Sequence, residues 1–370
     1  MQYALMTMPA LPNVISERYD TIVAGAGPAG IMAAFGAAQR GPVLLVESSS
    51  LPRDKSCGGM LNEYAQEFLE GFGIPEDLVR SPRHVYFRYV DWDRGILKPT
   101  ELRFLNVDRL RFDEWLLGLL PDNVDVAGQT SVLSFAEDDG GVSVELKSNG
   151  TVKTVSCENL VGADGARSTV RRTLGIGSVA TYVTLQDFCR LEGELEPYFD
   201  CIYMRDIGDS FAYSYVVPKG EVAIVGSVYY PKTKRPHEKQ DATLAMLRAK
   251  FPQLGETVKR EACVALSVRD PHDVVPGKGR VLLAGEAGGF MSPTSGEGIS
   301  YAMNSGRLAG EAIASHSPVD ALDAYARATG HITANVRRKL RWLPFMESRA
   351  GKYLAGFVPA PLVSKVTKGL

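Results

Sequence analysis

The chain has 370 residues, of which 45% are hydrophobic and 23% charged, and its formal net charge is −2. This length favours two domains, and the near-neutral charge argues against nucleic-acid binding. Five cysteines without a Cys-x-x-Cys pair argue against a disulfide framework or a zinc site. The first seventeen residues contain no Lys or Arg, and no apolar run is long enough to span a bilayer. We therefore expect a cytoplasmic protein.

The first predicted unit, residues 19–50, follows the order strand, glycine turn, helix, strand and acidic residue. Residues 22–24 and 43–46 are apolar runs typical of buried parallel strands. The turn Gly25-Ala-Gly-Pro-Ala-Gly30 allows a tight bend, a close approach of backbone to a pyrophosphate, and close helix packing. Glu47 follows the second strand, where its carboxylate can accept hydrogen bonds from a ribose. The spacing therefore predicts a dinucleotide site at the helix N-terminus.

The later elements follow in a mixed order of helices and strands. We predict a loop at 50–59, a helix near 61–72, strands within 85–104, a helix at 107–120, strands within 124–161 and 183–230, a helix at 241–251, a buried strand at 281–284 and a helix from 299 to about 314. Asp138-Asp-Gly-Gly141 and Asn149-Gly150 are hairpin signals. The nucleotide-binding pieces are thus spread along the chain, with strand-rich pieces inserted between them.

Two later stretches narrow the dinucleotide to FAD. Leu160-Val-Gly-Ala-Asp-Gly-Ala-Arg-Ser-Thr-Val-Arg171 places an Asp-Gly turn before a helix. Residues 281–303 combine a buried strand, the turn Gly285-Glu-Ala-Gly-Gly289, a Pro-x-x-Gly-x-Gly loop from Pro293, and a helix that begins near Ile299. Backbone N–H groups at that helix N-terminus can face the pyrimidine side of a flavin. There they stabilise the negative charge that develops on reduction.

Together these stretches resemble the FAD-binding flavoproteins of the aromatic hydroxylase type, and within them the geranylgeranyl reductase family. Lys55-Ser-Cys-Gly-Gly-Met-Leu61 resembles the Cys-Gly-Gly loop of that family, and residues 293–303 resemble its flavin loop. Tyr213-Ser-Tyr-Val-Val-Pro-Lys-Gly220 resembles its Tyr-x-Trp-x-Phe-Pro substrate motif. Val107-Asp-Arg-Leu-Arg-Phe-Asp113 resembles the segment whose Arg contacts FAD, here Arg109. The likeness covers residues 19–310.

The resemblance implies an α/β fold, in which a Rossmann-like FAD-binding domain carries an inserted antiparallel β-sheet substrate domain, as in p-hydroxybenzoate hydroxylase. We assign residues 1–84, 105–178 and 270–330 to the FAD-binding domain. Residues 85–104 and 179–269 form the substrate domain, and 331–370 form a basic helical tail.

Three positions depart from the family pattern. Glu286 stands where Asp usually contacts the flavin ribityl chain, and its extra methylene must reposition or abolish that contact. Tyr215 and Val217 replace the usual Trp and Phe of the substrate motif, so the substrate can differ from a geranylgeranyl lipid. Met60 follows the Cys-Gly-Gly loop, where a third Gly is common.

The motifs and the resemblance define the candidate site. The cofactor-binding candidates are Gly25, Gly27, Pro28, Ala29, Gly30, Glu47, Ser48, Cys57, Gly58, Arg109, Asp164, Gly285, Glu286, Pro293, Gly296, Gly298 and Ile299. The substrate-binding candidates are Tyr213, Tyr215 and Pro218, and the catalytic candidates are Cys57 and Tyr213. Cys57 could equally be an inert packing residue, the tyrosines could fill core, and Glu297 could face flavin or solvent. The histidines show no ligand pattern, so we expect no metal.

The resemblance implies an FAD-dependent oxidoreductase that reduces carbon–carbon double bonds of a prenyl-like or other apolar substrate by hydride transfer from reduced flavin N5. No second nucleotide-binding unit is found in the sequence, so the electron donor is either transiently bound NAD(P)H or ferredoxin. Two alternatives stay open: a flavin monooxygenase that hydroxylates an aromatic substrate, and a flavoprotein that modifies a partner protein. The Cys-Gly-Gly loop and the strand at 213–220 favour the reductase.

The tail at 331–370 carries eight Lys or Arg residues against one acid, Glu347, with Trp342 and Phe345 among its apolar residues. A basic amphipathic segment can lie on an anionic membrane surface, here the inner membrane. It can also be a helix that packs on the FAD-binding domain and keeps a solvated basic face, which is the interpretation we favour.

Overall fold

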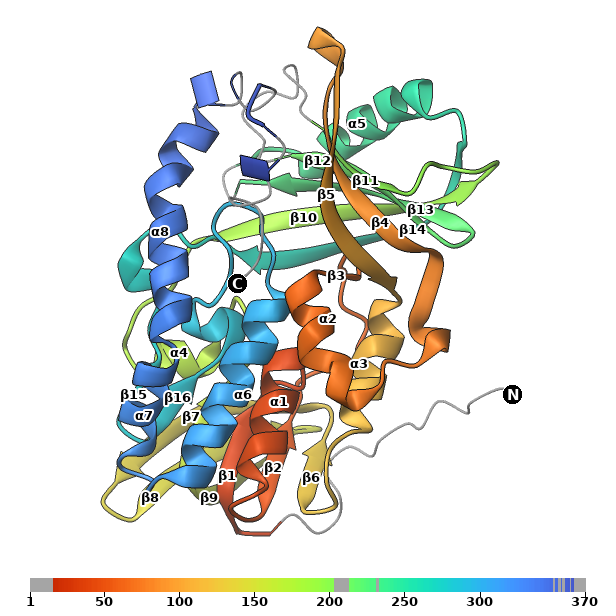
Figure 1. Cartoon of the computed structure of the whole chain (residues 1–370). Coiled ribbons are helices and arrows are strands. Elements are labelled where there is room, and N and C mark those ends of the chain that lie inside the picture. Colours follow the sequence, from red (N-terminus) through yellow and green to blue (C-terminus); the bar gives the residue numbers. More distant parts are fainter. Residues whose placement is uncertain are drawn as a thin grey trace.

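The computed structural model describes residues 16–202, 213–230, 233–348, 350–351, 354, 357–359 and 361–362. Two eight-stranded sheets and the helices around them make up this part of the chain (Figure 1). Residues 1–15 lie outside the described part, as do residues 203–212, which belong to the range 183–230 where strands are predicted. Four of the eight basic tail residues also lie outside: Arg349, Lys352, Lys365 and Lys368.

The first sheet has the strand order β15-β16-β9-β1-β2-β6, and the β7–β8 hairpin extends from β9. Its strands are β1 (Arg18–Ala24), β2 (Val43–Val46), β6 (Val124–Ala127), β7 (Thr130–Asp138), β8 (Gly141–Ser148), β9 (Thr151–Gly162), β15 (Gly277–Lys278) and β16 (Val281–Leu283). β1 pairs in parallel with β2 and β9, as its short apolar sequence predicts for a strand buried on both faces. Asn149 and Gly150 both have positive φ and form the turn between β8 and β9.

Glycines bring α1 (Pro28–Ala37) and α6 (Ile299–Ser315) side by side against the first sheet (Figure 1). A Cβ atom at Gly306 would lie 2.1 Å from the Ala29 carbonyl oxygen, and one at Gly310 would lie 2.6 Å from the Ala33 carbonyl oxygen. Any larger residue at these positions would therefore push the two helices apart. Both helices begin at the cavity described below.

The second sheet has the order β14-β10-β13-β12-β11-β4-β5-β3. Its strands are β3 (Met60–Leu61), β4 (Val79–Asp91), β5 (Ile96–Val107), β10 (Thr181–Leu191), β11 (Tyr198–Ile202), β12 (Ser214–Lys219), β13 (Val222–Tyr229) and β14 (Leu254–Leu266). The strand pairs are antiparallel except for β11 with β4. α5 (Pro236–Lys250) buries Leu244 and Leu247 on one side of the sheet. The opposite face carries Phe199, Tyr215 and Val217.

Several helix boundaries differ from the predictions. α2 (Glu63–Leu69) is shorter than the helix expected near 61–72 because Met60–Leu61 pairs with β5 and Glu70–Phe72 tightens into a 3-10 turn. α3 (Arg109–Leu117) and α4 (Thr169–Thr173) begin at the Asp108 and Ser168 caps.

β14 was not predicted from the sequence. It is an edge strand with mostly half-exposed residues, so its sequence shows no apolar alternation.

The described part of the tail is helical. After α7 (Ala321–Ala328), α8 (Gly330–Glu347) runs along the side of the molecule toward the second sheet (Figure 1). α8 buries Ile332, Val336, Lys339, Leu340 and Leu343, so this part of the tail packs on the protein and exposes its arginines. No helix among the described residues is long and apolar enough to cross a membrane.

Candidate active site

A cavity of ≈ 1570 Å³ extends from the first sheet to the inner face of the second. This volume exceeds the ~300–1,000 Å³ of most small-ligand pockets. The cavity therefore has room for a large cofactor and a further molecule. All the candidate cofactor-binding and substrate-binding residues line it except Gly30 and Pro218.

The glycine turn shapes one end of the cavity. Gly25 has φ +100°, and a Cβ atom there would lie 2.4 Å from the Ala163 carbonyl oxygen. A Cβ atom at Gly30 would lie 1.8 Å from the Gly25 carbonyl oxygen, so Gly30 acts through packing and does not line the cavity. Gly27 is the N-cap of α1 and provides no side-chain cap. The first N–H groups of α1 are thus left for a ligand at the positive end of the helix.

Glu47 is held beside this turn. Its Oε2 accepts the Ala26 N–H at 3.0 Å, and its Oε1 accepts the Ser49 N–H at 3.0 Å and the Ser48 hydroxyl at 3.1 Å. The side chain is buried yet lines the cavity, as does Ser48. A carboxylate fixed in this way keeps lone pairs for a ribose hydroxyl.

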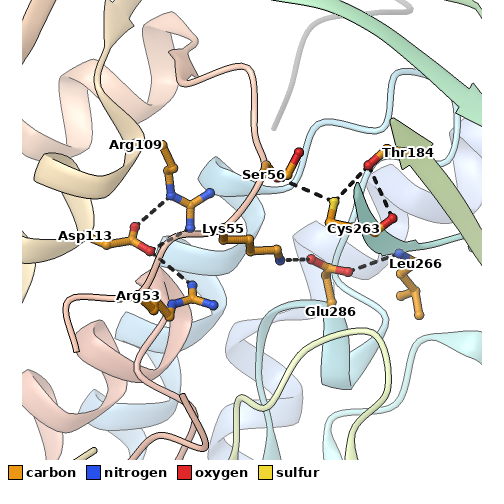
Figure 2. A network of polar contacts seen from close by, with 9 residues as sticks. All are labelled: Arg53, Lys55, Ser56, Arg109, Asp113, Thr184, Cys263, Leu266 and Glu286. Carbon is orange, nitrogen blue, oxygen red and sulfur yellow. Dashed lines mark hydrogen bonds and ion pairs between the residues drawn. The ribbon is translucent and has the colours of Figure 1, made fainter. Parts of the chain in front are cut away.

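The guanidinium groups of Arg53 and Arg109, which both line the cavity, share the carboxylate of Asp113 (Figure 2). Asp113 accepts from Arg109 Nε at 2.8 Å and Nη2 at 3.0 Å, and it pairs with Arg53 Nη2 at 3.2 Å. Burial opposes the charge on Arg109, but Asp113 outweighs burial and raises the pKa of Arg109. Arg109 therefore stays cationic at the cavity.

Arg53 was missed by the sequence reasoning, although it lies in the loop before Cys57. Its Nη2 covers the glycine turn, only 2.5 Å from where a Cβ atom of Gly27 would be. Its Nε is buried without a hydrogen-bond partner among the described residues. A cation over an uncapped helix N-terminus fits a pyrophosphate. Its partner Asp113 is remote in sequence, so only the fold reveals the pair.

Glu286 and Lys55 form a second network (Figure 2). Glu286 Oε1 accepts from Lys55 Nζ at 2.9 Å, and Oε2 accepts the Leu266 N–H at 3.0 Å. Burial raises the pKa of Glu286, but Lys55 and the Leu266 N–H outweigh burial, and the net pKa is lowered. The extra methylene of Glu286 thus takes the carboxylate to Lys55 and β14. Lys55 was also missed as a site residue.

Two helix N-termini carry their own acids. Asp164 Oδ2 accepts the N–H groups of Thr169 at 2.6 Å and Val170 at 3.1 Å, so this cavity-lining carboxylate caps α4. At α6, Glu297 Oε1 accepts the Ser300 N–H at 2.9 Å and Oε2 accepts the Ser300 hydroxyl at 2.8 Å. Burial raises the pKa of Glu297. Glu297 is therefore a partly buried member of the cavity wall.

Tyr213 and Tyr215 line the opposite side, with ring centroids 6.1 Å apart. The Tyr213 hydroxyl donates to the Ser295 carbonyl oxygen at 3.0 Å, which links β12 to the 293–299 loop. Gln186 Nε2 donates to the Tyr215 hydroxyl, and Ser56 Oγ donates to Gln186 Oε1 at 2.5 Å. These bonds create a polar strip beside the aromatic residues of this wall.

Pro218 is not brought to this cavity. Successive residues of a strand face opposite sides, so Pro218 lies on the face of β12 opposite Tyr215. Its carbonyl oxygen there accepts from Asn106 Nδ2 at 3.0 Å.

Cys57 lies on the cavity wall beside Gly58. Its Sγ accepts the Gly59 N–H at 3.4 Å. Cys201 and Cys263 also line the cavity, and all five cysteines are free thiols. Cys57 is partly exposed, so the structure favours a cavity-facing thiol over a fully buried packing residue.

The donor set fits FAD. An uncapped helix N-terminus with a covering arginine suits the pyrophosphate, Glu47 suits the ribose, and the α6 N-terminus at Gly298 suits an electron-rich ring. A parallel sheet with such a site, joined to an antiparallel sheet across one cavity, defines an FAD-dependent flavoprotein of the p-hydroxybenzoate hydroxylase-like fold. The chain belongs to the FAD binding domain family, whose model matches residues 18–338.

The chain is similar to known proteins in sequence and to solved structures in fold. "Protein CbrA" of Escherichia coli O9:H4 (strain HS) is 31% identical over 321 residues, which cover 85% of this chain and 86% of that protein. A geranylgeranyl bacteriochlorophyll reductase-like protein from Thermoplasma acidophilum has a TM-score of 0.77 at 21% identity, covering 95% of this chain and 92% of its own. PqsL, a probable FAD-dependent monooxygenase from Pseudomonas aeruginosa, has a TM-score of 0.68 at 16% identity, covering 92% and 100%. These two structures are similar in fold alone.

Proposed function

We propose that the protein is an FAD-dependent reductase that saturates carbon–carbon double bonds of a prenyl-like or other apolar substrate. The observation that carries this proposal is the apolar lining of the cavity beyond the glycine turn. This lining includes Phe104 and Phe199 on the aromatic face of the second sheet and the exposed Trp342 and Phe345 of α8. Such an apolar lining suits a chain-like substrate and excludes water from it.

Reduced FAD, when bound, supplies a hydride to one alkene carbon. The protein then has to deliver a proton to the other carbon. The Tyr213 hydroxyl already donates to the Ser295 carbonyl, whereas Cys57 Sγ accepts a hydrogen bond from Gly59. We assign the proton to the Cys57 thiol, because this thiol lines the cavity and only accepts in its hydrogen bond with Gly59.

The proposal is tested with the FAD-loaded protein, reduced without oxygen and mixed with long-chain prenyl alcohols. We expect flavin reoxidation together with a product that has gained two hydrogen atoms, and a slower reaction in Cys57→Ala at unchanged FAD content. Tyr213→Phe should leave the proton step intact. Reoxidation that needs oxygen, with an oxygen atom in the product, would overturn the reductase assignment.

One observation favours the second candidate, an aromatic monooxygenase. The Ser56–Gln186–Tyr215 strip places polar groups in the aromatic wall, where they would orient the hydroxyl of an aromatic substrate. In that case NAD(P)H consumption under air should rise with phenolic compounds and not with prenyl alcohols. Either NAD(P)H or ferredoxin serves as electron donor in the reductase proposal.

We also propose that the cavity opening meets an anionic membrane at the cytoplasmic side. Trp342 is 56% exposed and Phe357 is 63% exposed. Lys98 Nζ donates to the Val358 carbonyl, so Leu97 at the start of β5, which is 57% exposed, belongs to the same end of the molecule. α8, which carries Trp342, also exposes Arg337, Arg338 and Arg341. This combination is typical of surfaces that bind anionic lipid.

A further inference from the structure

A buried ammonium group lies on the cavity wall next to the start of α6. Lys339 of α8 is 4% exposed and lines the cavity. Its Nζ donates to the Tyr301 hydroxyl at 3.1 Å and to Ser292 Oγ at 3.3 Å. Arg337, Arg338 and Arg341 on the same helix are exposed. Lys339 is thus the lysine that α8 directs inward, and neither FAD binding nor substrate reduction as argued above uses it.

The hydrogen-bond partners of Lys339 are Tyr301 on α6 and Ser292, which directly precedes the 293–299 loop. The Tyr301 hydroxyl donates to Asn335 Oδ1 at 2.7 Å, so it is oriented to accept from Lys339. Ser292 also accepts from the Ser295 hydroxyl at 2.8 Å, and its N–H donates to the Glu297 carbonyl oxygen at 2.9 Å. The ammonium group therefore anchors the turn that leads into the α6 N-terminus.

Among the described residues, Glu297, Tyr301 and Arg338 are the titratable or charged groups shown to act on Lys339. Glu297 comes from the loop, Tyr301 from α6 and Arg338 from α8 itself. Burial lowers the pKa of Lys339 to about 8, with Arg338 acting in the same direction and Glu297 opposing it. A group with this pKa can change its charge under ordinary conditions when a new charge appears nearby.

We propose that Lys339, partnered by Glu297, sets the reduction potential of bound FAD and takes up a proton when the flavin is reduced. The α6 N-terminus at the cavity would face the ring end of bound FAD, where reduction adds negative charge. A cation in this poorly solvated wall stabilises the reduced form more than the oxidised form. This inference requires only FAD binding, and it stands whether the substrate is an alkene or an aromatic compound.

The test measures the midpoint potential of FAD in the holoprotein by equilibration with redox dyes, across the pKa of about 8. In Lys339→Met we expect a lower potential below that pH, because the cation is missing there. A tenfold loss of preference for reduced over oxidised FAD corresponds to about 30 mV for a two-electron couple. At pH well above the pKa, the wild type is also uncharged, so the two potentials should converge. Lys339→Arg should keep the higher potential without converging.

Controls separate charge from packing. Arg341→Met removes an exposed cation from the same helix and should leave the potential unchanged. Tyr301→Phe removes a contact of Nζ but keeps the ammonium. It should therefore lower the melting temperature and leave the midpoint potential nearly unchanged. If Lys339→Met fails to fold or to retain FAD, Glu297→Gln gives the mirror test, since losing the carboxylate should raise the potential. The proposal would be overturned if Lys339→Met and Glu297→Gln both had the midpoint potential of the wild type, with parallel pH profiles.

Discussion

Lys55 Nζ lies 2.9 Å from Glu286 Oε1, although the two residues are 231 positions apart in the sequence. Because Glu286 Oε2 also accepts the Leu266 N–H, this carboxylate joins the loop before Cys57 to the turn after β16 and to β14. One acid thus links the two sheets at the cavity. The Glu that departs from the family's usual Asp has a structural role that Asp, one methylene shorter, would fill less well.

Glu286→Gln should destabilise the protein by about 1–2 kcal/mol at neutral pH, because it leaves Lys55 partly buried without its counter-charge. The pKa of Glu286 is lowered in the folded state. Its stabilisation is therefore complete above the unfolded value of about 4.3 and is lost as pH falls through the folded pKa. Urea unfolding at neutral and acidic pH measures this, with Lys55→Met as the matched partner. Equal losses for Glu286→Gln at both pH values would contradict it.

Gly30→Ala should lower the stability of the protein, whereas Gly27→Val should abolish FAD binding. A Cβ atom at Gly30 meets backbone at 1.8 Å, so the turn must distort, at a cost of about 1–3 kcal/mol. A side chain at Gly27 meets the mobile end of Arg53, so the fold should persist while FAD is lost from the purified protein. Thermal melting and flavin absorbance distinguish the two effects. Gly71→Ala, where a Cβ atom meets nothing within 4 Å, serves as the control.

Gly226→Ala should block the substrate part of the cavity and spare the cofactor part. The new Cβ atom would lie 2.0 Å from the Tyr215 ring, which must then move into the cavity. We expect normal FAD content with at least about a tenfold rise in KM, equivalent to ~1.4 kcal/mol of binding. Tyr215→Phe, which keeps the ring in place, is the comparison. An unchanged KM would show that the substrate does not pass Tyr215.

Lys219 should make stability rise with pH. Burial lowers its pKa to about 7 in the folded state, where Nζ donates to the carbonyl oxygens of Gly59 and Val107. The unfolded chain keeps this proton up to a pKa of about 10.4, so it binds more protons than the folded chain between these values. The stability of the wild type relative to Lys219→Met should therefore increase from neutral to alkaline pH. Denaturant unfolding gives both profiles, and parallel curves would contradict the prediction.

Vesicle sedimentation tests the membrane proposal. The protein should bind vesicles that contain phosphatidylglycerol, and it should not bind vesicles of pure phosphatidylcholine. Salt should weaken the binding. Trp342→Ser with Phe345→Ser should reduce binding about tenfold, since each removes exposed apolar area. Leu133→Ser, which changes an exposed residue of β7 on the other sheet, should have no effect. Equal binding to both vesicle types would rule out electrostatic docking.

The sequence predicted a structural feature correctly where a single short segment contains all the residues that determine it. The parallel pairing of residues 22–24 with 43–46, the start of α1 at Pro28 and the Asn149-Gly150 turn follow from short-range patterns, and the structure confirms them. The FAD assignment is likewise confirmed by the family match. β14 was not predicted, because an edge strand with half-exposed residues shows no apolar periodicity in its sequence.

The sequence by itself determined the class of cofactor, because the glycine turns and helix starts that hold FAD are contiguous segments whose backbone geometry depends on their own residues. Only the tertiary structure showed that Arg53 covers Gly27, that Glu286 meets Lys55, that Pro218 faces away and that Lys339 points inward. These relationships join residues far apart along the chain. Their distances follow from how the two sheets and α8 pack, which no local pattern records.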